Sequence, residues 1–384
     1  MSKYRTLIYA FLFFTFLFFS SIYSAQAQEP TTTTPTSTPS FSETASDEFY
    51  RAKILTIKEE VGHEETVASV YTIEAQITNG LEKDTVVTIT HYDSTGSFEK
   101  RNMGVGDTVV LTKTYDYTGT PLYYLMDVYR VPALYFISGV FFFLAVWFGR
   151  KKGITSILGL ALSFVILIKF VVAKILDGSD PLLISLIGAT IIAVVSIYLA
   201  HGLQKRTTVA VISTLITLWL SAGLAWIFVS LTRLTGFGTE EAFLLATGPL
   251  SHIDLRGLLL AAIIIGALGV LDDITTAQAA TIDEIKKANP AVSFVQLYKH
   301  GLSVGQEHIS SLINTLVLAY AGASFPLLLL FQYSHLQPAW VVVNSEFMAE
   351  EIVRTLVGSS ALILAVPITT LLATYTFSKR KSPD

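Results

Sequence analysis

The 384-residue sequence contains no cysteine, which excludes a disulfide framework, thiolate metal ligands and a cysteine nucleophile. It is also poor in charge, since Asp, Glu, Lys and Arg make up 15% of the residues whereas hydrophobic residues make up 52%. One soluble core cannot use so much apolar sequence, so we expect most of it to face the lipid bilayer. The formal net charge of -4 indicates no nucleic-acid partner.

Motifs of several enzyme classes are absent as well. No string matches the phosphate-binding pattern G-x-x-x-x-G-K-[ST] or the zinc-peptidase pattern H-E-x-x-H, and we expect no cofactor and no resident metal. The segment Gly301–Gly305 does match G-x-S-x-G, with Ser303 at its centre. That string lacks the strand–turn–helix context of serine hydrolases, so we predict no catalytic residue and keep a membrane-embedded serine hydrolase as a third hypothesis.

The N-terminus has the features of an export signal. Lys3 and Arg5 precede an apolar run, residues 7–23, and the small residues at 25–27 suit a signal peptidase. We therefore predict a signal peptide over residues 1–27. Residues 28–46 are rich in Thr, Pro and Ser, which predicts a flexible extracytoplasmic linker.

Residues 47–130 alternate short β-branched runs with turn residues and predict an exported β-rich domain. Asn79-Gly80 is one of its clearest turns. Five short strands in so few residues favour a small closed barrel of OB type, because closure removes exposed edges. The strands are expected near residues 52–57, 67–77, 85–90, 108–114 and 122–128.

Residues 131–378 read as a polytopic α-helical membrane domain, followed by a basic cytoplasmic tail at 379–384. Apolar runs bounded by charges predict about seven transmembrane helices, at residues 132–149, 154–176, 181–200, 207–232, 255–274, 309–331 and 352–377. Lys and Arg cluster in alternate connections, and the intervening connections 177–180, 235–253 and 332–351 contain none. The β domain is therefore expected outside and the C-terminus in the cytoplasm, in the inner (cytoplasmic) membrane of a bacterial-type cell.

Several strings in this helical part resemble the YibE/F family of multi-pass membrane proteins. They are Gly266-Ala-Leu-Gly-Val-Leu-Asp-Asp273, Asn289-Pro290, Gly301, Asn314-Thr-Leu316 with Leu318-Ala-Tyr320, Gly178-Ser-Asp-Pro181, His201-Gly202 with Arg206-Thr207, Val357-Gly358 and Val366-Pro367. The resemblance is strong from about residue 132 to the end and weak over the β domain. It implies a membrane protein whose activity is unassigned and is often supposed to be permease-like.

Asp272 and Asp273 are the sharpest polar feature, at the predicted cytoplasmic end of the fifth span. Gly266, Gly269 and Asp273 share one helical face, and small residues let another helix approach closely. A carboxylate at such a junction could bind a cation or carry a proton, although both aspartates could equally be solvated at the headgroup level. We take Asp272, Asp273 and Gly269 as candidates for a transport pathway.

Further candidates come from polar residues inside other spans. Ser310 and Asn314 share a stripe of the sixth span and could line the pathway, or could join two helices by hydrogen bonds. Lys169 is the clearest intramembrane cation and could pair with Asp254 at an outer vestibule, or could extend outward beside Lys174. The connection 281–308 is expected to hold a helix that lies in the inner interface or re-enters the membrane.

Two functions of different class therefore remain open beside the hydrolase. The first is permease-like transport of a small solute or ion, with the β domain as a lid or docking module. The second is an envelope scaffold, in which the exported β domain binds a partner protein and the helices serve as an anchor.

Overall fold

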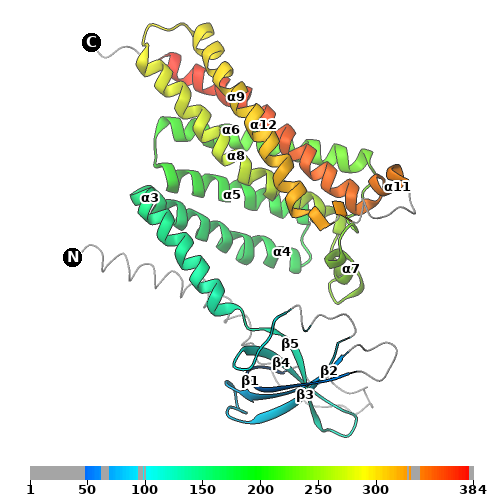
Figure 1. Ribbon diagram of the computed structural model, residues 1–384. Coiled ribbons are helices and arrows are strands. Elements are labelled where there is room, and N and C mark those ends of the chain that lie inside the picture. The colour runs from blue at the N-terminus through cyan, green and yellow to red at the C-terminus, as the bar shows by residue number, and fades with distance from the viewer. Residues whose placement is uncertain are drawn as a thin grey trace, which may run out of the picture. The chain divides into compact units, whose positions relative to one another are not determined.

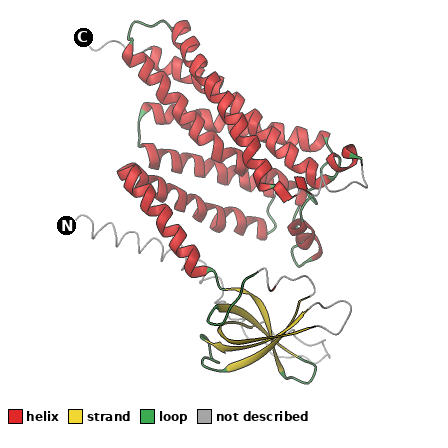
Figure 2. Ribbon diagram, viewed as in Figure 1, coloured by secondary structure: helices red, strands yellow, loops and turns green. Residues whose placement is uncertain are grey.

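The computed structural model describes residues 48–61, 69–93, 98, 101–326, 328–329 and 338–379. The predicted signal peptide, the linker and residues 380–384 of the predicted tail lie outside these residues. The chain divides into two compact units, Met1–Phe143 and Leu144–Asp384. Strands and helices separate along the chain, with all five strands before residue 131 and the long helices after it (Figure 2).

The five predicted strands are confirmed as β1 (Glu48–Val61), β2 (Ser69–Ile77), β3 (Val86–Asp93), β4 (Thr108–Tyr115) and β5 (Pro121–Val128). They form one antiparallel sheet in the order β3-β2-β1-β4-β5. The two edge strands, β3 and β5, also contact each other, so the sheet is nearly closed into a barrel. A small barrel-like sheet of five strands is therefore confirmed, and its assignment to the OB type stays a prediction.

The long first strand makes this closure possible. The first half of β1 pairs with β4 and its second half pairs with β2, with a register shift between Ile54 and Thr56. A bulge of this kind bends a strand and increases its twist. Side chains alternate between the barrel interior and its surface, and Ile54, Ile73, Ile89 and Leu111 are almost completely buried.

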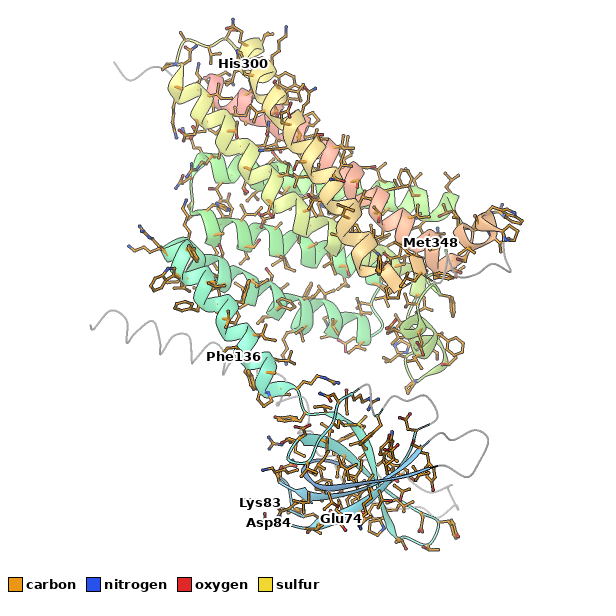
Figure 3. All side chains as sticks on the ribbon, viewed as in Figure 1. Glu74, Lys83, Asp84, Phe136, His300 and Met348 are labelled. Atoms are coloured by element: carbon orange, nitrogen blue, oxygen red, sulfur yellow. The ribbon has the colours of Figure 1, made fainter. Side chains whose placement is uncertain are left out.

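An ion-pair network occupies one part of this barrel. The Lys113 ammonium is buried and lies 2.5 Å from Glu82, whose carboxylate also accepts a hydrogen bond from the Tyr123 hydroxyl at 2.7 Å. These two donors hold the pKa of Glu82 below its usual value. On β2 the labelled Glu74 accepts a hydrogen bond from Thr56 at 3.0 Å (Figure 3).

The helical part contains nine α-helices and one π-helical stretch among the described residues. The elements are α3 (Val131–Ile166), η2 (Leu167–Val172), α4 (Ala173–Leu176), α5 (Pro181–His201), α6 (Lys205–Leu231), α7 (Glu240–Thr247), α8 (Leu255–Ala288), α9 (Phe294–Ala323), α11 (Ala339–Val343) and α12 (Glu346–Ser378).

Side-chain caps explain where several helices begin. The Asp180 carboxylate accepts a hydrogen bond from the amide of Leu183 at the start of α5, where Pro181 is the first helical residue. Asp254 caps α8 by accepting from the Arg256 amide at 3.1 Å. Ser293 opens α9 with a reciprocal capping box.

Five helical segments among the described residues are long and apolar enough to cross a membrane: Val131–Leu176, Pro181–His201, Lys205–Leu231, Leu255–Ala288 and Glu346–Ser378. The first segment leaves helical geometry at Arg150, where φ is 51° and ψ is -129°, so the two spans predicted on either side of this residue are two helices joined at a kink. A sharp turn of the ribbon marks it (Figure 1). The predicted span 309–331 is not among the five, because α9 ends at Ala323 and the predicted span continues into residues that lie outside the described part of the chain. Seven spans are therefore not confirmed.

Two predicted boundaries are wrong. The helix containing Asp272 does not end near residue 274 but continues as α8 to Ala288, and α9 is one helix from Phe294 to Ala323 rather than an interfacial or re-entrant helix followed by a separate span. The reason is tertiary: Gln278 and Ile282 on α8 and Gly301 on α9 are all buried in the helical core. Residues whose composition is typical of a connection are thus held in helices by packing.

Helix α8 occupies the centre of the helical unit. It packs against α5, α6, α9 and α12, as its course between them illustrates (Figure 1). Its side chains Ile264, Leu271 and Ile274 belong to the largest hydrophobic cluster, to which α5, α6 and α12 also contribute. Figure 3 marks the ends of the unit with His300, near the start of α9, and Met348, in the first turn of α12.

The segment between α6 and α7 is attached to the start of α12 by two carboxylates. Glu346 accepts hydrogen bonds from the Thr235 amide and hydroxyl, both at 2.6 Å, and from the Gly236 amide at 3.0 Å. Glu350 is 3% exposed and accepts from the Gly238 amide at 2.9 Å. These acids, expected in an outer connection, therefore organise that connection.

Candidate functional site

The interior of the helical unit is unusually rich in hydroxyl groups. Buried Ser and Thr side chains lie on the three helices that pack against one another, α6, α8 and α12. They are Thr207, Ser213, Thr214, Thr217 and Ser221 on α6, Thr275 on α8, and Ser359, Thr369, Thr370 and Thr374 on α12. Ser and Thr side chains commonly pack between membrane helices and hydrogen-bond there, so the hydroxyls that lack a partner are the ones that require a further reason.

Three polar residues of α8 connect it to all of its neighbours. Asp272, Thr275 and Gln278 are spaced three residues apart, and each step of three turns the side-chain direction by about 300°, or 60° short of a full turn. Successive residues therefore point toward different helices: Asp272 toward α5, Thr275 toward α6, and Gln278 toward α9 and α12. We call these three residues and their partners the polar seam.

Asp272 is the charged member of the polar seam. It is half-buried, and its Oδ2 atom lies 3.5 Å from the Ser196 hydroxyl of α5. Ser196 is five residues, or about 8 Å, from the end of α5, a helix just long enough to cross a bilayer. Asp272 thus lies within an apolar span rather than at its end. Its Oδ1 atom is buried without a hydrogen-bond partner in the described chain.

Thr275 and Thr214 join α8 to α6. Their hydroxyl oxygens are 2.6 Å apart, and both residues are fully buried. Thr275 also lies within hydrogen-bonding distance of the Leu271 carbonyl of its own helix, at 2.9 Å. This pair leaves little freedom for the two helices to slide along each other at this level.

Gln278 joins α8 to α9 and α12. Its fully buried amide nitrogen donates to the Gly301 carbonyl at 2.8 Å and to the Thr370 hydroxyl at 2.7 Å. The close approach depends on glycine, because a Cβ atom at Gly301 would collide with Ile282 and one at Gly305 would lie 3.0 Å from the Gln278 amide. The Gln278 Oε1 atom has no hydrogen-bond partner among the described residues.

Buried oxygens elsewhere in the helical unit share this property. Eight buried side-chain oxygens on α5, α6, α8 and α12 have no hydrogen-bond partner in the described chain: those of Ser185, Thr207, Ser221, Ser359, Thr369 and Thr374, with Asp272 Oδ1 and Gln278 Oε1. Carboxylate, amide and hydroxyl oxygens are the ligands of hard cations and of water. The seam can therefore solvate a small cation or a proton-carrying chain of water.

The structure separates Asp272 from the other predicted pathway residues. Asp273 and Gly269 are exposed on another face of α8. Ser310 and Asn314 are also exposed, because α9 packs through the face bearing Leu297, Gly301 and Gly305. Asp272 therefore has Ser196 beside it rather than Asn314. The expectation that Asp273, Gly269, Ser310 and Asn314 line a pathway stays a prediction.

The predicted outer pair, Lys169 and Asp254, does not form an ion pair in the described chain. Lys169 is exposed on the π-helical stretch η2. Asp254 is exposed and caps α8. Lys174 pairs instead with Asp177 at 3.3 Å.

The G-x-S-x-G string has a packing explanation. Gly301 and Gly305 are buried in the first half of α9, where they allow α8 and α12 to approach, whereas Ser303 is exposed. A nucleophile elbow requires a strand-to-helix turn, and this segment is helical throughout. The described residues also contain no group of three or more His, Cys, Asp or Glu side chains able to hold a metal ion.

Sequence reasoning missed Thr275, Gln278 and the hydroxyls of α6. A signal for them exists: Leu268, Leu271, Thr275, Gln278 and Ile282 follow each other at intervals of three or four residues. That periodicity continues the apolar face of the fifth span past residue 274. The spacing of Gly301 and Gly305 is the matching small-residue pattern on the facing helix.

Comparison with known proteins identifies one family. The sequence model of a family described as YibE/F-like protein matches residues 137–379, which cover most of the helical part and all of the polar seam. No curated protein and no solved structure matches the chain.

Proposed function

This chain belongs to the YibE/F-like protein family, and we propose that it is a permease-like membrane protein that moves a small cation, or a solute coupled to a proton. Several helices long and apolar enough to cross a membrane support a bilayer location. We further propose that the protein lies in the cytoplasmic membrane, with the β domain exported and the C-terminus inside, in keeping with the distribution of Lys and Arg.

The polar seam is the observation that carries this proposal. Buried oxygens without protein partners cost free energy in an apolar helical core, by about 1–3 kcal/mol each. A purely structural core gains nothing from them, whereas a pathway needs oxygens that are free to exchange partners as a solute passes. Asp272, with Thr275 and Gln278 in the turns that follow, would form the central part of that pathway.

The sign of the cargo follows from the charge of the seam. Asp272 is the only acidic residue of the seam, and no cation lies within ion-pairing distance of it in the described chain. A carboxylate without a counter-ion within a span is a site for a cation or a proton. Asp273, Gly269, Ser310 and Asn314 are exposed and lie outside the seam, so this proposal does not depend on them.

A ligand screen tests this function. The full chain in lipid nanodiscs is heated with a panel of monovalent and divalent cations and small metabolites at two pH values, because a ligand that binds only the folded state raises the unfolding temperature. A cargo should stabilise wild type and Asp273→Asn but not Asp272→Asn. A compound that stabilises all three proteins equally does not use Asp272, and that result would remove the basis of the proposal.

One observation favours a second function, partner binding by the β domain. Phe49, Thr112 and Tyr124 are direct cross-strand neighbours on β1, β4 and β5, so their side chains lie on one face. Phe49 is 53% exposed and Tyr124 is 51% exposed, and the Thr112 hydroxyl oxygen between them is buried without a partner in the described chain. Exposed aromatic side chains around a hydroxyl are typical of a recognition surface.

Site-specific cross-linking in cells tests this second function. A photoreactive phenylalanine at Tyr124 should form a cross-link that disappears in Phe49→Ser. The same probe at Tyr117, which is fully exposed in the β4–β5 turn, serves as the control. Equal labelling at both positions, or none at Tyr124, would contradict a scaffold function of this face.

A further inference from the structure

A cavity of about 410 Å³ lies where three helix ends meet. It is lined by the start of α6 (Gln204, Lys205 and Arg206), the end of α8 (Asp283 and Lys287) and the end of α12 (Thr376, Phe377 and Lys379). The ribbon also has the start of α6 on the same side of the helical unit as the ends of α8 and α12 (Figure 1). The volume of the cavity is within the range of roughly 300–1,000 Å³ that is usual for small-molecule sites.

The cations of this cavity outnumber its acids. Its single carboxylate, Asp283, lies 2.7 Å from the Lys287 ammonium, so each of these two residues has a counter-ion. Lys379 lies over the ring of Tyr375, 4.0 Å from its centre. A cation held by an aromatic ring keeps its full charge, and Lys379 therefore still attracts an anion.

Lys205 and Arg206 have no ion-pair partner in the described chain. They belong to the first turn of α6, a helix of 27 residues whose N-cap, Gln204, makes no capping hydrogen bond with its side chain. The first amide groups of such a helix have no acceptor within the helix and carry a partial positive charge. In the same turn the Thr207 hydroxyl is 2% exposed and has no partner in the described chain.

We propose that this cavity binds an anionic phosphate group, supplied by the headgroup of a phospholipid. Lys205, Arg206 and Lys379 provide the charge, and the first amides of α6 provide further hydrogen-bond donors. The position at the ends of three long apolar helices is that of the lipid headgroups, where basic pockets between helices bind acidic lipids. Phe377 adds an apolar wall for the part of the lipid next to the headgroup. This site is independent of the transport pathway and would exist in a scaffold as well.

Binding of short-chain lipids to the full chain in detergent tests the proposal. The probes are dihexanoyl phosphatidylglycerol, which is anionic, dihexanoyl phosphatidylcholine, which is zwitterionic, and inorganic phosphate. The test variant is Lys205→Gln/Arg206→Gln, and the matched control is Lys151→Gln/Lys152→Gln, which removes the same charge from another connection of the helical unit. Affinity is obtained from the rise in unfolding temperature with probe concentration.

Wild type and the control should bind phosphatidylglycerol at least about tenfold more tightly than phosphatidylcholine, and the test variant should lose about tenfold or more of that affinity. Lys379→Gln removes a charge on the α12 side of the cavity and should cause a smaller loss of affinity. Because this variant leaves α6 unchanged, it keeps the test valid if the changes in α6 impair folding. Inorganic phosphate binding as tightly as phosphatidylglycerol would support the same site with a soluble ligand. Equal affinity for both lipids, or an equal loss in the control, would overturn the proposal.

Discussion

Replacing the single side chain of Gln278 should clearly destabilise the helical unit. Gln278→Ala removes the hydrogen bonds to Gly301 and Thr370 and leaves space behind a fully buried side chain. Two interhelical hydrogen bonds contribute about 1–2 kcal/mol together, and the lost packing adds a similar amount. The expected loss in the free energy of unfolding is about 3 kcal/mol. For a unit of this size it corresponds to a fall of about 6–12 °C in Tm.

Thermal unfolding in nanodiscs measures this effect, and two variants control it. Gln278→Leu keeps most of the volume but removes both interhelical hydrogen bonds, so it should lose about 1–2 kcal/mol. Gln306→Ala removes the same side chain from an exposed position on α9 and should change stability by less than about 0.5 kcal/mol. If Gln278→Ala unfolds at the same temperature as Gln306→Ala, Gln278 does not hold α8, α9 and α12 together.

Two further predictions concern the connection after α6 and the β domain. Glu346→Ala should expose the Thr235 and Gly236 amides, so that their hydrogen exchange becomes about tenfold faster. The control is Glu240→Ala, which removes an exposed carboxylate and should leave both rates unchanged. Unchanged rates in Glu346→Ala would show that Glu346 does not attach this segment to α12. The pKa of Glu82 is lowered in the folded state by its hydrogen bond from Lys113, so its contribution to stability is present above the unfolded pKa of about 4.3 and is lost as the pH falls through the folded value. Amide exchange in β4, corrected for the intrinsic effect of pH, should therefore accelerate as the pH falls below about 4.3 in wild type and much less in Glu82→Gln. Equal acceleration in both proteins would contradict this role of Glu82.

Strands β2, β3 and β4 were predictable because each follows a rule of period two. On β2, the buried residues Ile73, Ala75 and Ile77 alternate with half-buried ones, and this alternation fixes which face of the strand points into the barrel. The number of strands predicted that the sheet closes, but not how it closes. Strand β1 is divided between two partners at the register shift after Ile54, and no particular residue marks that shift.

The helical part was predictable where apolar runs are long and uninterrupted, as in α5 and α6. The extension of α8 past residue 274 was missed, because Thr275 and Gln278 are polar and tertiary contacts keep them in the helix. Periodicity places Ser310 and Asn314 on one stripe of their helix, but it cannot show which stripe faces the neighbouring helices. The partner of Asp272, a serine 76 residues earlier, has no local signature at all.

Cation flux in proteoliposomes, compared between Asp272→Asn and Asp273→Asn, tests the central claim most directly. The two aspartates are adjacent in sequence, but Asp272 contacts Ser196 within the polar seam and Asp273 is exposed. The account predicts that wild type and Asp273→Asn carry the same flux and that Asp272→Asn loses about tenfold or more. Equal flux through Asp272→Asn and wild type, or equal loss in both variants, would contradict a pathway along the seam.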